Sequence, residues 1–183
     1  MKKLSYLFMI GMMVIAGSFT SCQEIADELE DAVEVTINTE LSVPFVAVPD
    51  ASKGASFKVS EVLDPANNED LADYLEKIQS VEITNITVNV TSVSSSDLIL
   101  ESAVFNLTDN VNGSEFRFSI PNNSAVAEGS VFEVGADNPD WDTINEIISA
   151  MHASTVEAVG TFNLDEFEVG FEYVVSVRVV AKM

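Results

Sequence analysis

The sequence predicts a mainly β protein: an antiparallel β-sandwich, Ig-like or of a related type, with about seven or eight strands and two short inserted helices. Alternation of apolar and polar residues is the dominant pattern over most of the 183 residues. Segments rich in Ser, Asn, Asp and Gly separate the alternating stretches. Few strand-helix-strand alternations occur, so a parallel sheet is not indicated.

The two longest strands are expected near the ends of the domain. Alternate positions are apolar over residues 32–43, and the same alternation runs from Phe171 to Ala181. Each of these strands should bury one face. Five further strands are expected between them, at residues 55–63, 80–93, 97–108, 114–120 and 155–165.

The strand over residues 80–93 contains an irregularity that the apolar pattern reveals. Its apolar positions move from Val81 and Ile83 to Ile86 and Val88, which changes the parity of the alternation. A slip of one residue would turn the apolar set to the wrong face of the sheet. We therefore expect a β-bulge near Asn85 that restores the register.

Two segments carry a helical period instead of a strand period. In residues 67–80, apolar side chains recur at positions i, i+3, i+4 and i+7 from Leu71 to Ile78, and Tyr74 within this set is expected in the core. In residues 138–152 the same spacing runs from Ile144 to Met151, with Asn138 and Pro139 at the start. Each helix should cover an end of the sandwich or an open sheet edge.

The first residues form a secretory signal pattern, with two lysines ahead of an apolar segment over residues 4–16. This segment is shorter than the roughly 20 residues that cross a bilayer core. The residues that follow, FTSC at positions 19–22, resemble the lipobox of bacterial lipoproteins. The resemblance implies cleavage before Cys22 and lipidation of that cysteine. The alternative is a plain secreted protein, cut nearby, in which Cys22 is a free thiol.

The resemblance also implies a place in the cell. Acyl chains on Cys22 would anchor the protein on a membrane, and Gln23 agrees with delivery to an outer membrane. The spaced acids between Glu24 and Asp31 resemble the export tag of surface lipoproteins from Bacteroidota-type bacteria, and either membrane face stays open. The predicted organisation is a signal peptide at 1–21, an acidic tether at 22–32 and a single sandwich domain at 33–183, similar to small lipoproteins of that group.

Charge excludes one class of partner. After loss of the signal segment, six basic residues face thirty acidic ones, which gives a net charge of −24. Binding to nucleic acid needs clustered Lys and Arg at the phosphates. The basic residues that remain are scattered along the chain, so we expect no nucleic-acid partner.

Catalytic motifs are missing from the sequence. No G-x-S-x-G elbow, P-loop, G-x-G-x-x-G or H-E-x-x-H pattern occurs. His152 is the only histidine, and the dipole of the helix that it is expected to end explains its position. Cys22 is the only cysteine, which excludes disulfides and zinc ribbons from the mature domain. The sequence therefore predicts a protein that is not an enzyme.

Residues 135–142 are the one candidate for ligand chemistry. Asp137, Asp140 and Asp142, together with Asn138, offer the hard oxygen ligands that calcium prefers. Calcium is the one cofactor that these residues suggest. The alternative is that Asp, Asn and Pro simply begin the helix. Trp141 is a candidate for stacking on a sugar, with burial in the core as its alternative.

These observations predict a non-catalytic, membrane-anchored envelope lipoprotein that acts as a binding or structural module at the outer membrane. Its partner, beyond the membrane itself, would be an unidentified protein or polysaccharide. The alternative function is a periplasm-facing protein for lipid handling or envelope housekeeping.

Overall fold

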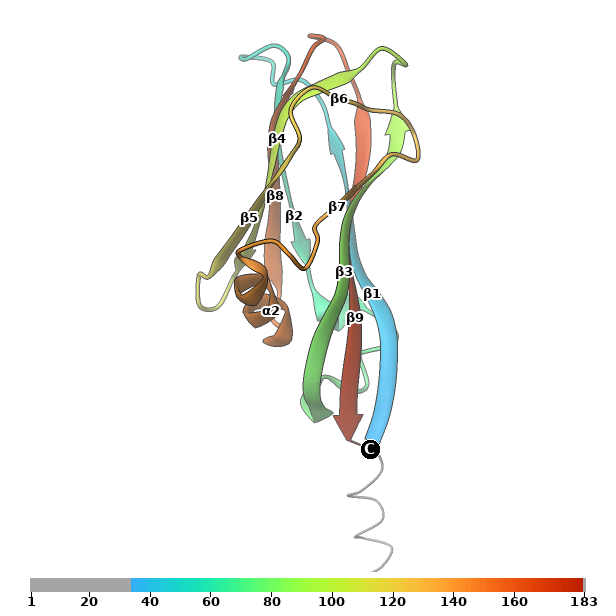
Figure 1. The fold of residues 1–183 in the computed structure, drawn as a ribbon, viewed down its shortest axis with the longest axis vertical. Helices are drawn as coiled ribbons and strands as arrows, with labels where there is room; N and C mark the ends of the chain where they lie inside the picture. The colour runs from blue at the N-terminus through green and yellow to red at the C-terminus, as the bar shows by residue number, and fades with distance from the viewer. Residues whose placement is uncertain (1–33, 183) are drawn as a thin grey trace, which may run out of the picture.

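The computed structural model describes residues 34–182 and confirms the predicted fold of two packed antiparallel sheets (Figure 1). The first sheet contains, in spatial order, β1 (Glu34–Ala47), β9 (Val169–Lys182), β3 (Ile78–Val93) and β7 (Val131–Glu133). The second sheet contains β2 (Ser56–Leu63), β8 (Ser154–Phe162), β4 (Ile99–Asp109) and β5 (Glu115–Ile120), while β6 (Ser124–Ala125) pairs with the other end of β4.

All seven predicted strands are present, and the alternation missed only the short strands β6 and β7. The predicted β-bulge is confirmed, because the register between β3 and β9 shifts between Ile83 and Asn85. On the far side of the bulge, Ile86 and Val88 are fully buried. The extra residue therefore keeps the apolar positions on the face that the core needs.

The predicted helix at 138–152 is confirmed as α2 (Trp141–Ser149). It buries Ile144, Ile147 and Ile148, and it lies on the side of the sandwich between β3 and β5 (Figure 1). The helix ends before Met151, which has a positive φ of 51°. The helix is shorter than predicted because Met151 adopts a left-handed conformation that interrupts it.

The helix predicted at 67–80 is wrong. Only two short 3-10 turns form, η1 (Pro65–Asn67) and η2 (Leu75–Lys77), and β3 begins directly afterwards. The Asn68 side chain accepts from the backbone N–H groups of Asp70 and Leu71, while its Nδ2 donates to the Glu40 carbonyl of β1 at 2.9 Å. Such local side-chain bonds compete with a helix.

The end of the same segment forms part of a β-sheet instead of a helix. Ile78 pairs with Ala181 of β9 instead of continuing the helical period. Leu71 is fully buried as expected. Tyr74 is only half-buried, so the prediction that it lies in the core is correct only in part. A strand pairing with a distant partner has overridden a local helical pattern.

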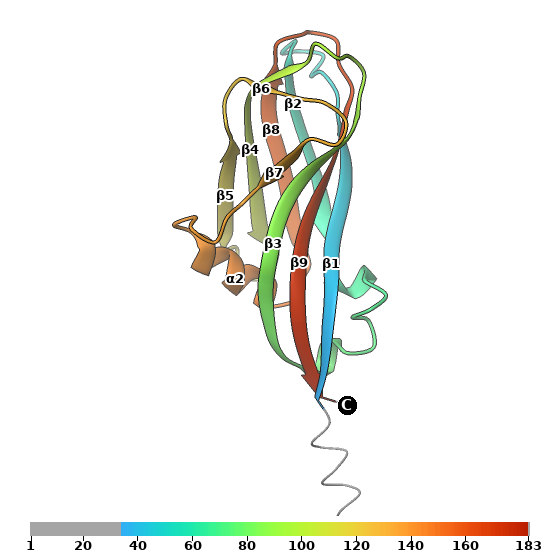
Figure 2. The same ribbon diagram turned by 45° about the vertical axis from the view of Figure 1, so that its right-hand side comes forward.

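The first sheet is longer than the second, so it has two halves (Figure 2). We call residues 41–47, 86–93 and 169–175 the upper half, and residues 34–40, 78–85 and 176–182 the lower half. The upper half faces the second sheet. The segment 64–77 lies beside the lower half, held there by a 2.8 Å bond from Thr39 Oγ1 to Asp70 Oδ2.

The N-terminal predictions concern residues outside the described part of the chain. These are the signal peptide at 1–21, the tether at 22–32 and the lipidation of Cys22, all of which stay predictions. Among the helices within residues 34–182, none has the length and apolar character needed to cross a bilayer.

Candidate functional site

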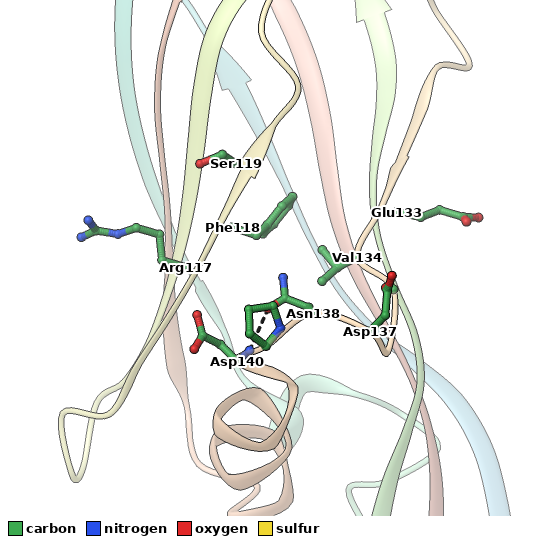
Figure 3. A pocket seen from close by; sticks show the side chains of 10 residues that line it. Arg117, Phe118, Ser119, Glu133, Val134, Asp137, Asn138 and Asp140 are labelled. Carbon is green, nitrogen blue, oxygen red and sulfur yellow. Dashed lines mark hydrogen bonds between the residues drawn. The ribbon is translucent and has the colours of Figure 1, made fainter.

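A polar groove of about 490 Å³ opens between β5 and the chain that follows β7 (Figure 3). Arg117, Phe118 and Ser119 of β5 form one wall. Glu133 and Val134 form the other wall, and residues 135–140, which lead into α2, close the lower end. The groove thus lies where the open sides of the two sheets face each other.

The alternation in β5 explains the chemistry of this groove. Phe116, Phe118 and Ile120 turn to the core, whereas Arg117 and Ser119 are exposed. Across the groove, Val134 is buried and Glu133 is exposed. The bottom of the groove is therefore apolar, with Phe118 and Val134 pointing toward one another, and its rim is polar (Figure 3).

The backbone of β5 presents unpaired groups to the groove. Asp109 N–H donates to the Ser114 carbonyl at 2.9 Å, which fixes the alternation of bonded pairs in the β4–β5 ladder. By this alternation Phe116 and Phe118 bond to β4, and the N–H and C=O groups of Arg117 and Ser119 point away from it. Within residues 34–182, no hydrogen bond reaches these groups from the open side.

The short strand β7 repeats this arrangement on the opposite wall. Val134 N–H donates to the Ile86 carbonyl at 3.0 Å, so Val134 belongs to a bonded pair of the β3–β7 ladder. The backbone of Glu133, one residue earlier, then points away from β3. Within the part of the chain that the structure describes, two strand edges with unpaired backbone donors and acceptors thus flank the same groove.

The edges on the opposite side of the sandwich are protected. In β1, Pro44 has no N–H to offer, and the Glu40 carbonyl accepts the Asn68 side chain. In β2, the Ser56 carbonyl accepts the Asp50 N–H at 2.7 Å, and Lys58 places a positive charge on the strand. Proteins use such devices to prevent an edge from pairing with another chain. The edge of β5 beside the groove carries the charged residues Glu115 and Arg117 but no proline, and within residues 34–182 no other segment bonds to its outer backbone groups.

The charge of the groove is acidic. Glu133, Asp137 and Asp140 are all exposed, and within the described residues none of them forms an ion pair. Arg117 is the only basic residue of the lining, and its Nε donates to Asn106 Oδ1 at 2.7 Å. The lining therefore carries three carboxylates and one guanidinium, and none of these four groups forms an ion pair within residues 34–182.

The structure separates the residues of the predicted calcium loop. Asp137 and Asp140 line the groove, whereas Asp142 lies in the first turn of α2. Asn138 Oδ1 is occupied by the N–H of Asp140 at 2.9 Å. Over residues 34–182, no group of three or more acidic, histidine or cysteine side chains is placed to hold a metal ion. Calcium binding gains no support here and stays a prediction.

Trp141 begins α2 and is half-buried against the apolar core. It is not among the residues that line the groove. The prediction that it stacks on a sugar is not tested by this arrangement.

Asp109 and His152 form the arrangement that most resembles part of a catalytic triad. His152 Nδ1 lies 3.4 Å from Asp109 Oδ2, at the end of the second sheet. The nearby hydroxyl of Ser154 donates to the His152 backbone carbonyl at 3.5 Å and not to the ring. A catalytic triad needs the serine hydroxyl to bond to the imidazole ring. These contacts therefore connect the end of β4 to the start of β8 but do not form a catalytic triad.

The pKa of Asp109 is lowered below its usual value of 3.8. The main cause is the N–H of Val111, which donates to the carboxylate at 2.7 Å. Burial opposes this shift, and His152 adds to it. Asp109 is therefore a buried carboxylate held in its charged form by a turn, as a structural residue would be.

Sequence reasoning singled out Asp137 and Asp140 of the groove but missed Glu133 and the β5 residues Arg117, Phe118 and Ser119. The alternation predicted the strand at 114–120. No local signal showed that this strand would lie at a sheet edge, because an edge is defined by the absence of a neighbour from elsewhere in the chain.

No known family and no curated protein matches the chain. Three solved virus structures are similar to it. A chain from Desmodium yellow mottle tymovirus has 12% identity and a TM-score of 0.34, covering 80% of this chain and 84% of that one. A chain from the mud crab tombus-like virus has 11% identity and a TM-score of 0.38, covering 81% of this chain and 82% of that one. A chain from turnip yellow mosaic virus has 7% identity and a TM-score of 0.31, covering 80% of this chain and 96% of that one.

These comparisons correct the predicted function and location. The similar structures come from viruses, which contradicts the prediction of a lipoprotein module at an outer membrane and its periplasm-facing alternative. Because all three TM-scores lie below 0.5, these similarities assign no function to this chain.

Proposed function

We propose that this protein is a non-catalytic interaction module that receives an extended segment of a partner protein along the open edge of β5. The supporting observation is the set of unpaired backbone groups at Arg117 and Ser119, which point toward the groove. An extended peptide adds to such an edge as a further strand, and its main chain supplies the hydrogen bonds.

The shape of the groove supports this mode of binding. A strand rises about 3.4 Å per residue, and its side chains alternate between two faces. A strand beside β5 would turn every second side chain toward Phe118 and Val134 at the bottom of the groove. The remaining side chains would face solvent on the outer surface of the second sheet. Main-chain bonds would then supply affinity, and the apolar positions would supply selectivity.

The other polar cluster of the domain supports a role without catalysis. Asp109 and His152 lie at the end of the second sheet and lack a serine at the ring. The carboxylates that line the groove are all exposed, and none of them belongs to a catalytic motif of the sequence. Contact with a partner is the function that this geometry serves.

A selection of random short peptides displayed against the full chain tests the proposal. Ser119→Pro removes the outward N–H of β5 and leaves the bonded pairs with β4 in place. We expect selected peptides to bind Ser119→Pro at least about tenfold more weakly, a loss of about 1.4 kcal/mol. Ser60→Pro makes the same change on the edge of β2 and should keep full binding.

Hydrogen exchange gives a second readout that needs no substitution. A bound strand should slow exchange of the Arg117 and Ser119 amides while exchange in β2 stays the same. Failure to enrich any peptide, or equal binding to wild type and a correctly folded Ser119→Pro, would refute strand addition at β5.

A further inference from the structure

A strand added to β5 would place every second side chain beside the outward residues of β5. Arg117 is one of these outward residues, and its side chain points away from the core in the direction opposite to Phe118 (Figure 3). Residues directly opposite each other in neighbouring strands have their side chains on the same face of the sheet. The residue of the bound strand opposite Arg117 would therefore lie next to the guanidinium, on the outer face of the second sheet.

Arg117 is the last residue of a polar row that crosses this outer face. In the register of the sheet, Glu157 of β8 lies opposite Asn106 of β4, and Asn106 lies opposite Arg117 of β5. The Glu157 carboxylate pairs with Lys58 Nζ of β2 at 2.6 Å. Asn106 Oδ1 accepts from Arg117 Nε at 2.7 Å. The row therefore ends at the edge of the sheet with a positive charge, beside the position that an added strand would fill.

The guanidinium of Arg117 is held in place and still has donors to offer. Asn106 takes its Nε, whereas its two Nη groups form no hydrogen bond and no ion pair within residues 34–182. Glu115, which is also outward on β5, does not pair with it either. The planar fork of an arginine matches the two oxygens of a carboxylate. A side chain that is already positioned loses less conformational freedom when it binds.

We propose that Arg117 selects the partner at this edge, and that the bound strand carries Asp or Glu at the position opposite Arg117. This inference rests on the proposed function and adds the chemistry of one partner residue. A neighbour of that acid along the strand would turn inward to Phe118 and Val134. Because thirty acidic residues of the chain repel an acidic segment as a whole, we expect one acid at this position and not an acidic run.

The test begins with selected peptides that lose binding to the full chain on Ser119→Pro, since these occupy the β5 edge. We expect Asp or Glu to be enriched at one of their outward positions. Replacement of that acid by Asn or Gln should weaken binding about two- to fivefold at low salt, as an exposed cross-strand pair would. The difference should shrink at physiological salt, because ions screen exposed charges.

A charge swap identifies the residue that this acid meets. Arg117→Glu should bind the peptide with Lys in place of the acid more tightly than the original peptide, which reverses the order found with the wild type. Arg117→Gln should bind the acidic and the neutral peptide equally. Lys77→Glu makes the same change of net charge at an exposed residue of the segment 64–77 and should keep the wild-type order. Circular dichroism checks that each variant keeps its fold.

The outcomes distinguish this inference from the proposed function. If no outward position prefers an acid and Ser119→Pro still weakens binding, strand addition stands and the role of Arg117 is wrong. If Lys77→Glu reverses the order as Arg117→Glu does, the field of the whole chain selects the peptide, and the inference is again wrong. If no peptide binds at the β5 edge, the proposed function fails and the inference fails with it.

Discussion

The two halves of the long sheet share one apolar pattern but are covered in different ways. In the upper half, β1, β9 and β3 face a second sheet. In the lower half, the same three strands continue beyond that sheet and meet the segment 64–77 and the end of α2, where Ser149 Oγ donates to the Val81 carbonyl at 3.4 Å (Figure 2). A comparison of these halves shows what a second sheet contributes.

Aromatic rings fill the upper half. Phe171 of β9 lies 5.9 Å from Phe45, 6.1 Å from Phe105 and 6.3 Å from Phe57, measured between ring centroids. These rings come from strands of both sheets. Gly160 of β8 makes room for this packing, because a Cβ there would lie 2.6 Å from the ring of Phe57. Interiors packed in this way tolerate little change of volume.

The lower half contains no aromatic residue on its strands. Its central strand is fully covered, since Val177, Val179 and Ala181 are buried, but Val35 and Ile37 on the flanking strand β1 are only half-buried. Irregular chain covers a narrow stripe of a sheet, whereas a second sheet covers its whole width. We therefore expect the lower half of the sheet to unfold locally more readily than the upper half.

Removal of the central ring of the upper half should have the largest effect. Phe171→Ala deletes a side chain with no exposed area, so we expect a loss of about 3 to 5 kcal/mol in the free energy of unfolding. Urea denaturation monitored by circular dichroism measures this loss. A loss below about 1 kcal/mol would show that the aromatic core is not what stabilises this half.

Removal of the apolar anchor of the lower half should cost less and act locally. Leu71→Ala should lower the free energy of unfolding by about 2 to 3 kcal/mol, because irregular chain can close around part of the cavity. Amide exchange at the start of β3 should accelerate, while exchange at Val88 and Val90 should follow only the global change. Equal acceleration in both halves would mean that the sheet opens as one unit.

Asp109 ends β4 and so marks the level at which the second sheet stops. Its lowered pKa means that the native state favours the carboxylate, so its stabilising effect is complete above about pH 4 and is lost as pH falls through the folded pKa. Asp109→Asn should therefore destabilise the protein at pH 6 and lose this disadvantage in more acidic solution. Urea denaturation at pH 6 and pH 3 makes the comparison, and a difference independent of pH would contradict the assignment.

The smallest effect is expected at Tyr173 of the upper half. Its hydroxyl is buried and, within residues 34–182, has no hydrogen-bond partner. Burial also raises the pKa of this phenol. Tyr173→Phe removes the unpaired group and keeps the ring, so the free energy of unfolding should change by less than about 1 kcal/mol, toward greater stability. A thermal melt detects the direction, and a clear loss of stability would mean that the hydroxyl has a partner in solution, such as water.

The segment 64–77 shows which features a local sequence pattern predicts correctly and which it does not. The spacing from Leu71 to Ile78 predicted a helix, and Leu71 is indeed buried, but Asn68 bonds to β1 and Ile78 joins the sheet. The bulge near Asn85 was predictable because the alternation of apolar and polar residues shifts by one position between neighbouring residues. The loss of the helix was not, because it depends on strands far along the chain.

The sequence by itself determined the strands, their buried faces, the bulge and the acidic surface, since each follows from neighbouring residues or from composition. Only the tertiary structure decided that β5 and β7 lie at sheet edges and that their free backbone groups flank one groove. It also brought Phe118 next to Val134 and placed the acids around them. Alternation sets which face of a strand is buried, but the identity of its neighbours depends on long-range pairing that no local pattern records.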